Sequence, residues 1–197
     1  MKIIRMIVLL MLLVAHGLAW GGFEEGLAAA KAGDYATALR EWTPLAELGD
    51  SRAQYHLGIM YENGQGIPQD YKEAVKWYRE SAEQGYARAQ YNLALMYRYG
   101  QGVPQDDKEA VNWYSEAAEQ GYYKAQNNLG LMYGTGFGVP QDYVQAYKWY
   151  SIAGANGDET GTKNRDVVAE EMTPAQITEA QKLVKEWMEK HQRVDKQ

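Results

Sequence analysis

Hydrophobic and polar positions recur along this chain with a period of 36 residues. Residues 53–88 and 89–124 are identical at 24 of 36 positions, and a third copy begins at Ala125 and continues to Gly157. Ahead of these copies, residues 34–52 repeat only the second half of the unit. A fixed period of roughly 20 to 50 residues is typical of repeat arrays. The pattern therefore predicts a stack of similar structural units.

Each copy predicts two antiparallel helices. Ala53 and Leu57 begin one apolar stripe at helical spacing. Gly58 lies on this stripe, and the later copies have Ala94 and Gly130 at the same position. Because glycine weakens a helix, we expect this small residue to be needed where a neighbouring helix approaches closely.

The second helix of each copy has clear start and stop signals. It is expected to begin at Asp70, Asp106 and Asp142, each two residues after a proline, and Glu73 follows three positions after the first of them. This spacing predicts a capping box, in which the two side chains reciprocally bond backbone N–H groups. The helix should end at Gly85 and its equivalents, where a left-handed residue can close the last turn.

The array has atypical ends. Residues 23–32 predict a helix that pairs with the incomplete repeat, and Thr173 and Gln176 predict a capping box that opens a closing helix. Terminal units of this kind cover the ends of a stack. In chain order, the predicted segments are a signal peptide at 1–19, an N-terminal helical unit at 20–52, repeats at 53–88, 89–124 and 125–160, and a degenerate cap with a closing helix at 161–197.

The first residues predict a secretory signal peptide. Lys2 and Arg5 precede an apolar run over residues 6–14, and the small residues Gly17 and Ala19 suit cleavage after Ala19. The alternative is an uncleaved anchor, but the run is shorter than the roughly 20 apolar residues that span a bilayer. We therefore expect an exported protein, periplasmic or secreted, with no stable membrane insertion after cleavage.

Composition narrows the classes of partner and chemistry. The chain has 26 acidic and 20 basic residues and a formal net charge of −6, which argues against nucleic acid as a partner because that needs a basic footprint. It has no cysteine, which excludes disulfides, cysteine-type zinc sites and thiol catalysis.

No arrangement of residues predicts catalysis. The three histidines are His16 in the predicted signal peptide, His56 in the first full repeat and His191 near the C-terminus, too far apart for a histidine-based triad. The serines lack the spacing that activates a nucleophile. The glycine loop at residues 64–66 and its equivalents lack the Gly-Lys-Ser/Thr of a phosphate-binding loop. We expect no catalytic residue, no cofactor and no metal.

The repeat unit resembles a known family. Its pattern, AxYxLGxMYxxGxGVPQDYxEAxxWYxxAAEQGxxxA, is similar to the Sel1-like repeat, a relative of the tetratricopeptide repeat, over residues 53–157 and partly over 23–52. The resemblance implies an all-α, right-handed α-solenoid of stacked antiparallel helix pairs with a C-terminal capping helix. It also implies a non-catalytic scaffold for other proteins. Exported members often bridge their helices with cysteine pairs, which are absent here, so this chain must be stabilised by packing alone.

The resemblance also indicates a groove. In tetratricopeptide relatives, first-helix residues at fixed offsets from the small packing residue line the concave face. Transferred to this chain, the offsets give Arg52, Tyr55, Ile59, Glu62, Asn63, Arg88, Tyr91, Leu95, Arg98, Tyr99, Lys124, Asn127 and Leu131. Gly134 and Thr135 hold the two remaining positions in the third repeat.

The groove residues suggest a kind of partner. Arg52, Arg88 and Lys124 place one cation in each repeat, and we call them the basic ladder. Such a ladder would suit a protein or peptide with an acidic segment or a C-terminal carboxylate, and Tyr55 and Tyr91 would add rigid contact area. The alternative is that these cations are merely solvated. We expect the scaffold to be a monomer.

A function of another class stays open. A module that binds peptidoglycan or another glycan, with weak hydrolase activity of the β-lactamase kind, would use exposed aromatic, acidic and amide side chains. Glu62, Asn63, Tyr91 and Tyr99 supply that mixture. Glycosidases need paired carboxylates, however, and the later repeats have Arg98 and Gly134 in place of Glu62.

Overall fold

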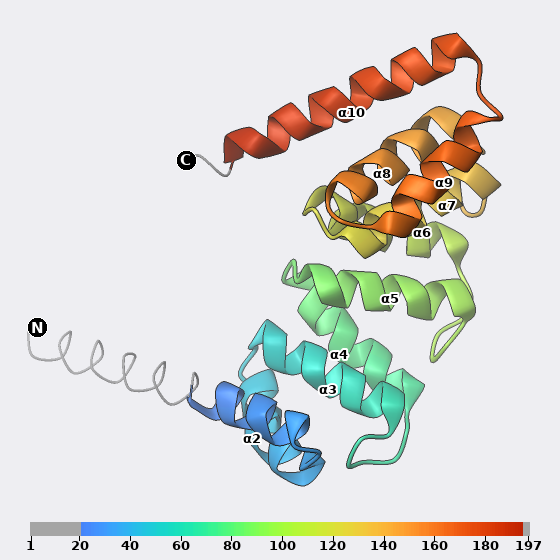
Figure 1. Cartoon of the computed structure of the whole chain (residues 1–197). Coiled ribbons are helices and arrows are strands. Elements are labelled where there is room, and N and C mark those ends of the chain that lie inside the picture. The colour runs from blue at the N-terminus through green and yellow to red at the C-terminus, as the bar shows by residue number, and fades with distance from the viewer. Residues whose placement is uncertain (1–20, 195–197) are drawn as a thin grey trace, which may run out of the picture. The chain divides into compact units, whose positions relative to one another are not determined.

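A computed structural model of the chain describes residues 21–194, and side chains as far as residue 191. The predicted signal peptide lies outside the described residues. Within them the regular structure is entirely α-helical, which confirms the predicted all-α solenoid class (Figure 1). The chain divides into two compact units at residues 84 and 85.

Unit 1 contains the N-terminal helices and the first full repeat. After a helix through residues 21–31, it comprises α2 (Tyr35–Glu47), α3 (Ser51–Asn63) and α4 (Tyr71–Glu83). Neighbouring helices pack in pairs, α2 against α3 and α3 against α4. Phe23, Trp42 and Leu57 are among the side chains that form its core.

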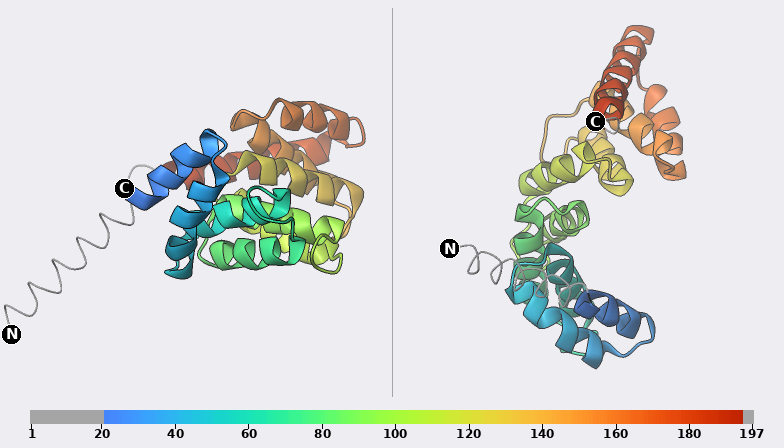
Figure 2. Two further views of the ribbon diagram at one scale, coloured as in Figure 1. Left: turned by 90° about the horizontal axis from the view of Figure 1, so that it is seen from below. Right: turned by 90° about the vertical axis from the view of Figure 1, so that its left-hand side faces the viewer.

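Unit 2 contains the other two full repeats and the C-terminal cap (Figure 2). Its helices are α5 (Ala87–Tyr99), α6 (Asp107–Glu119), α7 (Tyr123–Thr135), α8 (Tyr143–Ala155), α9 (Glu159–Ala169) and α10 (Pro174–Val194). Consecutive helices from α5 to α9 pack on one another, and α10 returns to pack on α8.

The predicted N-caps are confirmed, but the capping boxes of the repeats are only half formed. The Asp70 carboxylate accepts bonds from the backbone N–H groups of Lys72 and Glu73. The reciprocal bond from Glu73 was wrongly predicted, because the Asp70 N–H donates instead to the Tyr61 carbonyl at 2.9 Å. That bond ties the loop to the preceding helix. In contrast, α10 opens with a complete capping box, in which Thr173 and Gln176 bond each other's backbone N–H.

The small residue of each first helix lies where the second helix crosses it. A Cβ atom added to Gly58 would lie 2.5 Å from the Tyr78 ring, and one added to Gly130 would lie 2.7 Å from the Tyr150 ring. Ala94 is buried at the same position in the middle repeat. The close approach that the sequence predicted is therefore a tyrosine ring laid on the small residue.

The closing helix packs on the rest of unit 2 through an aromatic cluster, and its Ala180 also packs with Ala146 and Tyr150 of α8. Trp187 on α10 packs edge-on against Trp149 of α8, and its Nε1 donates to the Glu119 carboxylate at 3.1 Å. The His191 ring stacks on Trp187 with centroids 3.7 Å apart. These contacts cover the apolar end of the stack, as a terminal cap must. None of the helices in the described part of the chain is long and apolar enough to cross a membrane.

Candidate functional site

In unit 1, the basic residue of the predicted groove is held by a carboxylate of the chain itself. The guanidinium of Arg52 lies 2.8 Å from Asp50 Oδ2 and 4.2 Å from the centre of the Phe23 ring. Asp50 also caps α3 by accepting from the N–H groups of Arg52 and Ala53. Burial by itself would raise the pKa of Asp50, but these hydrogen bonds and the Arg52 charge lower it below the ordinary value.

The other groove residues of unit 1 also make internal contacts. Glu62 accepts a hydrogen bond of 2.5 Å from the Tyr78 hydroxyl, and the Asn63 amide donates to the Ile59 carbonyl at 3.0 Å. Tyr55 packs against the Tyr78 ring. On this face of unit 1, the carboxylates of Asp50 and Glu62 therefore accept hydrogen bonds from donors of the protein itself.

In unit 2, the first turn of α5 has a different composition. Tyr86 occupies the N-cap position and gives no side-chain cap bond, and Arg88 is exposed. Among the described residues, no ion pair is formed by Arg88. A shallow pocket of about 370 Å³ lies here, and Tyr86, Arg88, Gln120 and Tyr122 are among the residues that line it.

Tyrosine rings extend this surface along α5. Tyr91 packs against Tyr122 and Tyr114, with ring centres 5.3 Å and 5.8 Å apart. Burial raises the pKa of Tyr91, so its hydroxyl is protonated at neutral pH. Leu95 packs against the same core. This part of the predicted groove combines apolar rings with hydroxyl groups.

Arg98 and Tyr99 lie at the other end of α5. The Arg98 guanidinium is 5.8 Å from the centre of the Tyr99 ring and also contacts the sulfur of Met132 on α7. Tyr99 is 64% exposed, which makes it one of the few large hydrophobic side chains open to solvent. The arrangement offers a cation and an exposed ring side by side.

On α7, the predicted groove residues have three different environments. Lys124 is exposed in the first turn, again behind a tyrosine N-cap, Tyr122. Asn127 accepts a hydrogen bond of 3.0 Å from the Asn164 amide on α9. Leu131 lines a pocket of about 280 Å³ between α7, α8 and α9, which we call the terminal pocket.

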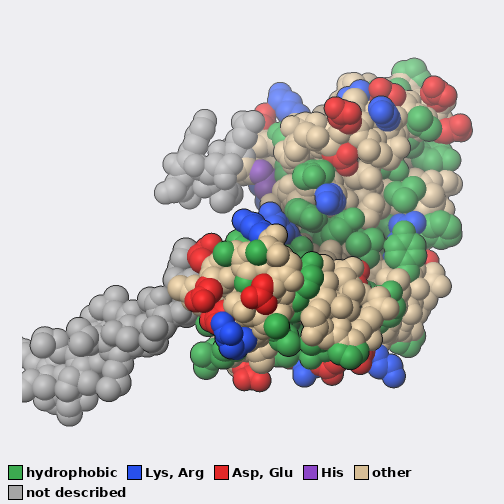
Figure 3. Space-filling view, turned by 60° about the horizontal axis from the view of Figure 1, so that its bottom comes forward, with side chains coloured by type: hydrophobic (Ala, Val, Ile, Leu, Met, Phe, Trp, Pro, Cys, Tyr) green, Lys and Arg blue, Asp and Glu red, His purple; other side chains and the backbone are tan. Residues whose placement is uncertain are grey.

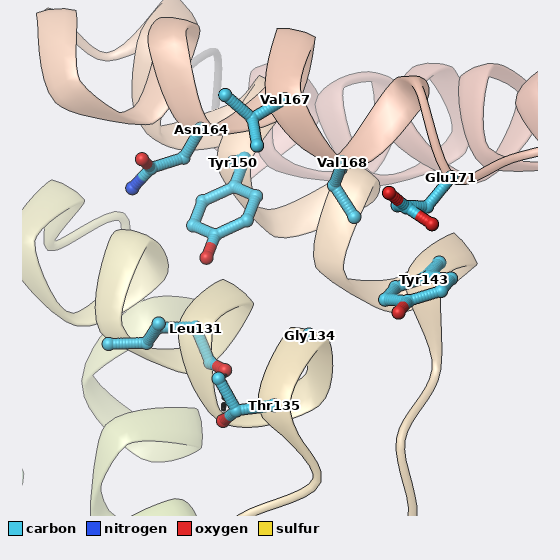
Figure 4. Close-up of a pocket in the computed structure, with 9 residues that line it drawn as sticks. All are labelled: Leu131, Gly134, Thr135, Tyr143, Tyr150, Asn164, Val167, Val168 and Glu171. Atoms are coloured by element: carbon cyan, nitrogen blue, oxygen red, sulfur yellow. Dashed lines mark hydrogen bonds between the residues drawn. The ribbon is translucent and has the colours of Figure 1, made fainter.

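The terminal pocket includes residues that the groove prediction missed. Gly134 and Thr135 are at positions that the groove offsets had indicated. The opposite wall of the pocket comes from α8, the second helix of the third repeat, and from the degenerate cap (Figure 4). That wall consists of Tyr143, Tyr150, Asn164, Val167, Val168 and Glu171. The sequence signalled a gap here because the third repeat has Gly134 where the earlier repeats have Glu62 and Arg98. The position of α9 could not be predicted, because its segment no longer follows the repeat pattern.

The side chains of the described residues provide charged and hydrophobic groups for binding, but no group that could hold a metal ion. On the face shown in Figure 3, acidic and basic side chains are interspersed with hydrophobic patches. His56 stacks on Trp42 and His191 on Trp187. Residues 21–191 contain no group of three or more histidine, aspartate or glutamate side chains that could hold a metal ion. The site combines hydrogen-bond donors, cations and aromatic rings with apolar side chains and the carboxylates of Glu62 and Glu171.

Comparison with solved structures shows where similar folds occur. A Sel1 repeat protein from Oxalobacter formigenes has 33% sequence identity and a TM-score of 0.71, with 74% of this chain and 60% of that chain covered. A protective antigen of uropathogenic Escherichia coli with an SLR fold has 29% identity and a TM-score of 0.62, with 87% and 45% covered. The present chain thus spans less than two thirds of both proteins.

A more distant structure agrees in fold alone. Cysteine-rich protein B of Helicobacter pylori has 20% identity and a TM-score of 0.53, with 65% of this chain and 92% of that chain covered. No curated protein matches this sequence.

The family follows from the repeats themselves. The family model of the Sel1 repeat matches residues 51–86, 87–122 and 124–158, which together make up more than half of the chain. Proteins built from this repeat are commonly interaction scaffolds and generally lack catalytic activity. On these matches and on its stacked helix pairs, the chain belongs to the Sel1 repeat family.

Proposed function

We propose that this protein is an exported, non-catalytic scaffold that binds an acidic peptide segment or chain terminus on the first-helix face of its repeats. The observation that carries this proposal is the contrast between the first turns of α3 and α5. In α3 the chain supplies a carboxylate, Asp50, to Arg52 and to the helix N-terminus. In α5 the equivalent residues are Tyr86, which does not cap the helix through its side chain, and Arg88, which forms no ion pair with a carboxylate of the described residues.

The pair in unit 1 demonstrates the chemistry that a ligand would use in unit 2. Guanidinium groups bind carboxylates through charge-assisted hydrogen bonds, and a carboxylate at a helix N-terminus is stabilised by the helix dipole. A partner carboxylate beside Arg88 would make both interactions, as Asp50 does for α3. Tyr86 and Tyr122, which line the same pocket, would contact the rest of the partner segment.

The wider tyrosine surface supports a peptide as the ligand. Tyr91 and Tyr99 present rings on α5 beside Arg88 and Arg98. Tyrosines give large contact areas at low conformational cost. The glycan hypothesis relied on the mixture of Glu62, Asn63, Tyr91 and Tyr99. Its acid and its amide already make hydrogen bonds within unit 1, so no observation favours a glycan over a peptide.

Export completes the proposal. The segment of residues 1–19 has the order of charged, apolar and small residues of a signal peptide. The similar Escherichia coli protein is described as a protective antigen, which agrees with a location accessible to the immune system. Sequencing of the mature N-terminus should give Trp20 as the first residue, and an intact Met1 would contradict cleavage.

The binding proposal is tested by photo-crosslinking in cells. A photoreactive residue is placed at Tyr55 in unit 1 or at Tyr99 in unit 2, and captured proteins are identified by mass spectrometry. We expect one partner with an acidic segment, and we expect its capture to fall when Arg88 and Lys124 are both replaced by glutamate.

The matched control makes the same change of charge elsewhere. Lys182 and Lys185 are exposed on α10, and Lys182→Glu with Lys185→Glu should leave capture unchanged. Equal loss in both double variants would show a general charge effect, and unchanged capture in the Arg88 and Lys124 variant would contradict the proposed surface. Circular dichroism checks that both variants remain helical.

A further inference from the structure

The terminal pocket lies where one repeat position has glycine in place of a longer side chain. In the first full repeat, Glu62 occupies this position, and its carboxylate accepts a hydrogen bond from the Tyr78 hydroxyl. The equivalent position in the third repeat is Gly134, and the equivalent tyrosine is Tyr150. A Cβ atom on Gly134 would lie 3.9 Å from the Tyr150 hydroxyl oxygen, so the hydroxyl faces the space that a longer side chain would fill.

Tyr150 is held in place as a hydrogen-bond donor. Its ring lies on Gly130, and Figure 4 shows its hydroxyl directed into the space bordered by Leu131, Gly134 and Thr135. Burial raises the pKa of Tyr150 to about 12, although the nearby positive charge of Arg98 acts in the opposite direction. At neutral pH the phenol is therefore protonated and can donate.

The surroundings favour a carboxylate as the missing acceptor. The Arg98 charge acts on the hydroxyls of both Tyr114 and Tyr150, so an anion bound at Tyr150 would be stabilised by it. The Tyr114 hydroxyl already accepts a hydrogen bond from the Asn128 amide. No hydrogen bond of the Tyr150 hydroxyl is present among the described residues, which leaves this tyrosine as the one of the three without a bonded partner for its hydroxyl.

We infer that the terminal pocket binds a glutamate side chain of the partner, whose carboxylate takes the place that Glu62 has in the first full repeat. The carboxylate accepts from the Tyr150 hydroxyl and lies in the field of Arg98. The methylene groups contact the apolar walls formed by Leu131 and Val168. This inference rests on the proposed function, because it names the side chain through which the bound peptide is anchored.

Glu171 places a negative charge at one end of the terminal pocket. It lines the pocket at the end near Tyr143, on the far side of Val168 from the Tyr150 hydroxyl (Figure 4). A carboxylate there repels acidic groups of the ligand, most strongly a second one that would lie near Tyr143. The bound glutamate is therefore expected to be followed or preceded by a neutral or basic residue rather than by another acid.

The test is a titration of the whole mature protein with three short peptides, followed by amide NMR. The probes are acetyl-Gly-Ala-Glu-Ala-Gly-amide, its glutamine counterpart, and acetyl-Gly-Ala-Ala with a free C-terminal carboxylate. Single anchoring side chains bind weakly, so the titration extends to about 10 mM. We expect the glutamate probe to shift the signals of Leu131 and Gly134, and the glutamine probe to bind roughly tenfold more weakly because it lacks the charge.

Two variants and a control test the geometry. Tyr150→Phe removes the donor and should weaken the glutamate probe by about tenfold, and Gly134→Glu should abolish binding by filling the pocket from within. Gln181→Glu adds the same charge on the exposed surface of α10 and should leave binding unchanged. Amide spectra of the variants without peptide verify that each remains folded.

The outcomes separate this inference from the proposed function. Equal binding of the glutamate and glutamine probes, stronger binding of the free carboxylate probe, absence of shifts up to about 10 mM, or undiminished binding to Gly134→Glu would overturn the glutamate site. If the partner captured from Tyr99 is still captured by Gly134→Glu, the scaffold stands without this anchor. If no partner is captured by the wild type, the scaffold itself fails, whatever the probes do.

Discussion

The first and the last full repeats use the same packing but expose different chemistry. In both, a tyrosine of the second helix lies on a glycine of the first, Tyr78 on Gly58 and Tyr150 on Gly130. In the first repeat the hydroxyl is bonded by Glu62. In the last repeat the corresponding position is Gly134, and a pocket opens beside the hydroxyl.

The same contrast appears at the start of the first helices. Asp50 caps α3 and pairs with Arg52, whereas Tyr86 and Tyr122 occupy the N-cap positions of α5 and α7 and make no side-chain hydrogen bond to the cap of their helix. The comparison shows that the positions that build the stack and those that face outward vary independently. The outward positions can therefore lose their internal partners without loss of the fold.

The largest loss of stability is expected when a side chain is added at Gly130, where the Tyr150 ring packs on the first helix of the last repeat. Gly130→Leu would place a Cβ atom 2.7 Å from the Tyr150 ring, and overpacking of this kind costs up to about 3 kcal/mol. Gly134→Ala, one turn later on α7, meets only ordinary contacts and should stabilise the helix by roughly 0.5–1 kcal/mol. Denaturation followed by circular dichroism compares the two, and equal effects would contradict the assigned packing.

Removal of the Tyr78 or the Tyr150 hydroxyl should change the free energy of unfolding by clearly different amounts. Tyr78→Phe deletes the bond to Glu62 and should lower the free energy of unfolding by about 1.5–3 kcal/mol, the range for a hydrogen bond to a charged group. Tyr150→Phe deletes a hydroxyl that faces the pocket and should cost less than about 0.5 kcal/mol. Hydrogen exchange measured within each unit locates the effect, and a large loss in Tyr150→Phe would show an internal partner for that hydroxyl.

The Asp50 carboxylate gives unit 1 a dependence on pH. Its pKa is lower in the folded protein, so its stabilising contribution is present above the unfolded value of about 3.9 and disappears as pH falls through the lower folded value. Asp50→Asn keeps a capping side chain but loses the charge, at a cost of about 0.5–1 kcal/mol at neutral pH. The stability difference between the two proteins should vanish in acid, and a difference that persists would contradict the role of the charge.

The two cations at the start of α3 and α5 are expected to differ, and Arg88 is expected to have the smaller effect on stability. Arg52→Ala breaks a pair in which both side chains are largely covered and should cost about 1 kcal/mol. Arg88→Ala removes an exposed side chain and should change stability by less than about 0.5 kcal/mol. Thermal denaturation of both variants provides the measurement, and an equal loss would reveal an internal partner for Arg88.

The sequence predicted the features that local chemistry controls. The 36-residue period, the aspartate caps at Asp70 and its equivalents, and the small residue on the first helix all depend on spacing within one unit, and the structure agrees with them. The reciprocal half of the capping box depends on a contact outside the helix. The Tyr61 carbonyl takes that N–H, and no local pattern reveals the competition.

The candidate site could be predicted only in part for the same reason. The offsets of the first helix found Leu131 at the terminal pocket, because that residue belongs to a regular repeat. They did not find Asn164 or Val168, which come from α9 after the repeat pattern has degenerated. Nor could they show that Arg52 is paired with Asp50 while Arg88 is exposed.

The most direct test of the contrast follows the ring carbons of Tyr78, Tyr114 and Tyr150 by NMR, with 13C-labelled tyrosine, during titration with the glutamate probe. We expect that the Tyr150 signal moves, that the glutamine probe moves it far less, and that the Tyr78 signal stays in place because Glu62 already accepts a hydrogen bond from its hydroxyl. A Tyr78 signal that moves as much as that of Tyr150, or a Tyr150 signal that does not move, would show that the two hydroxyls do not differ in this way.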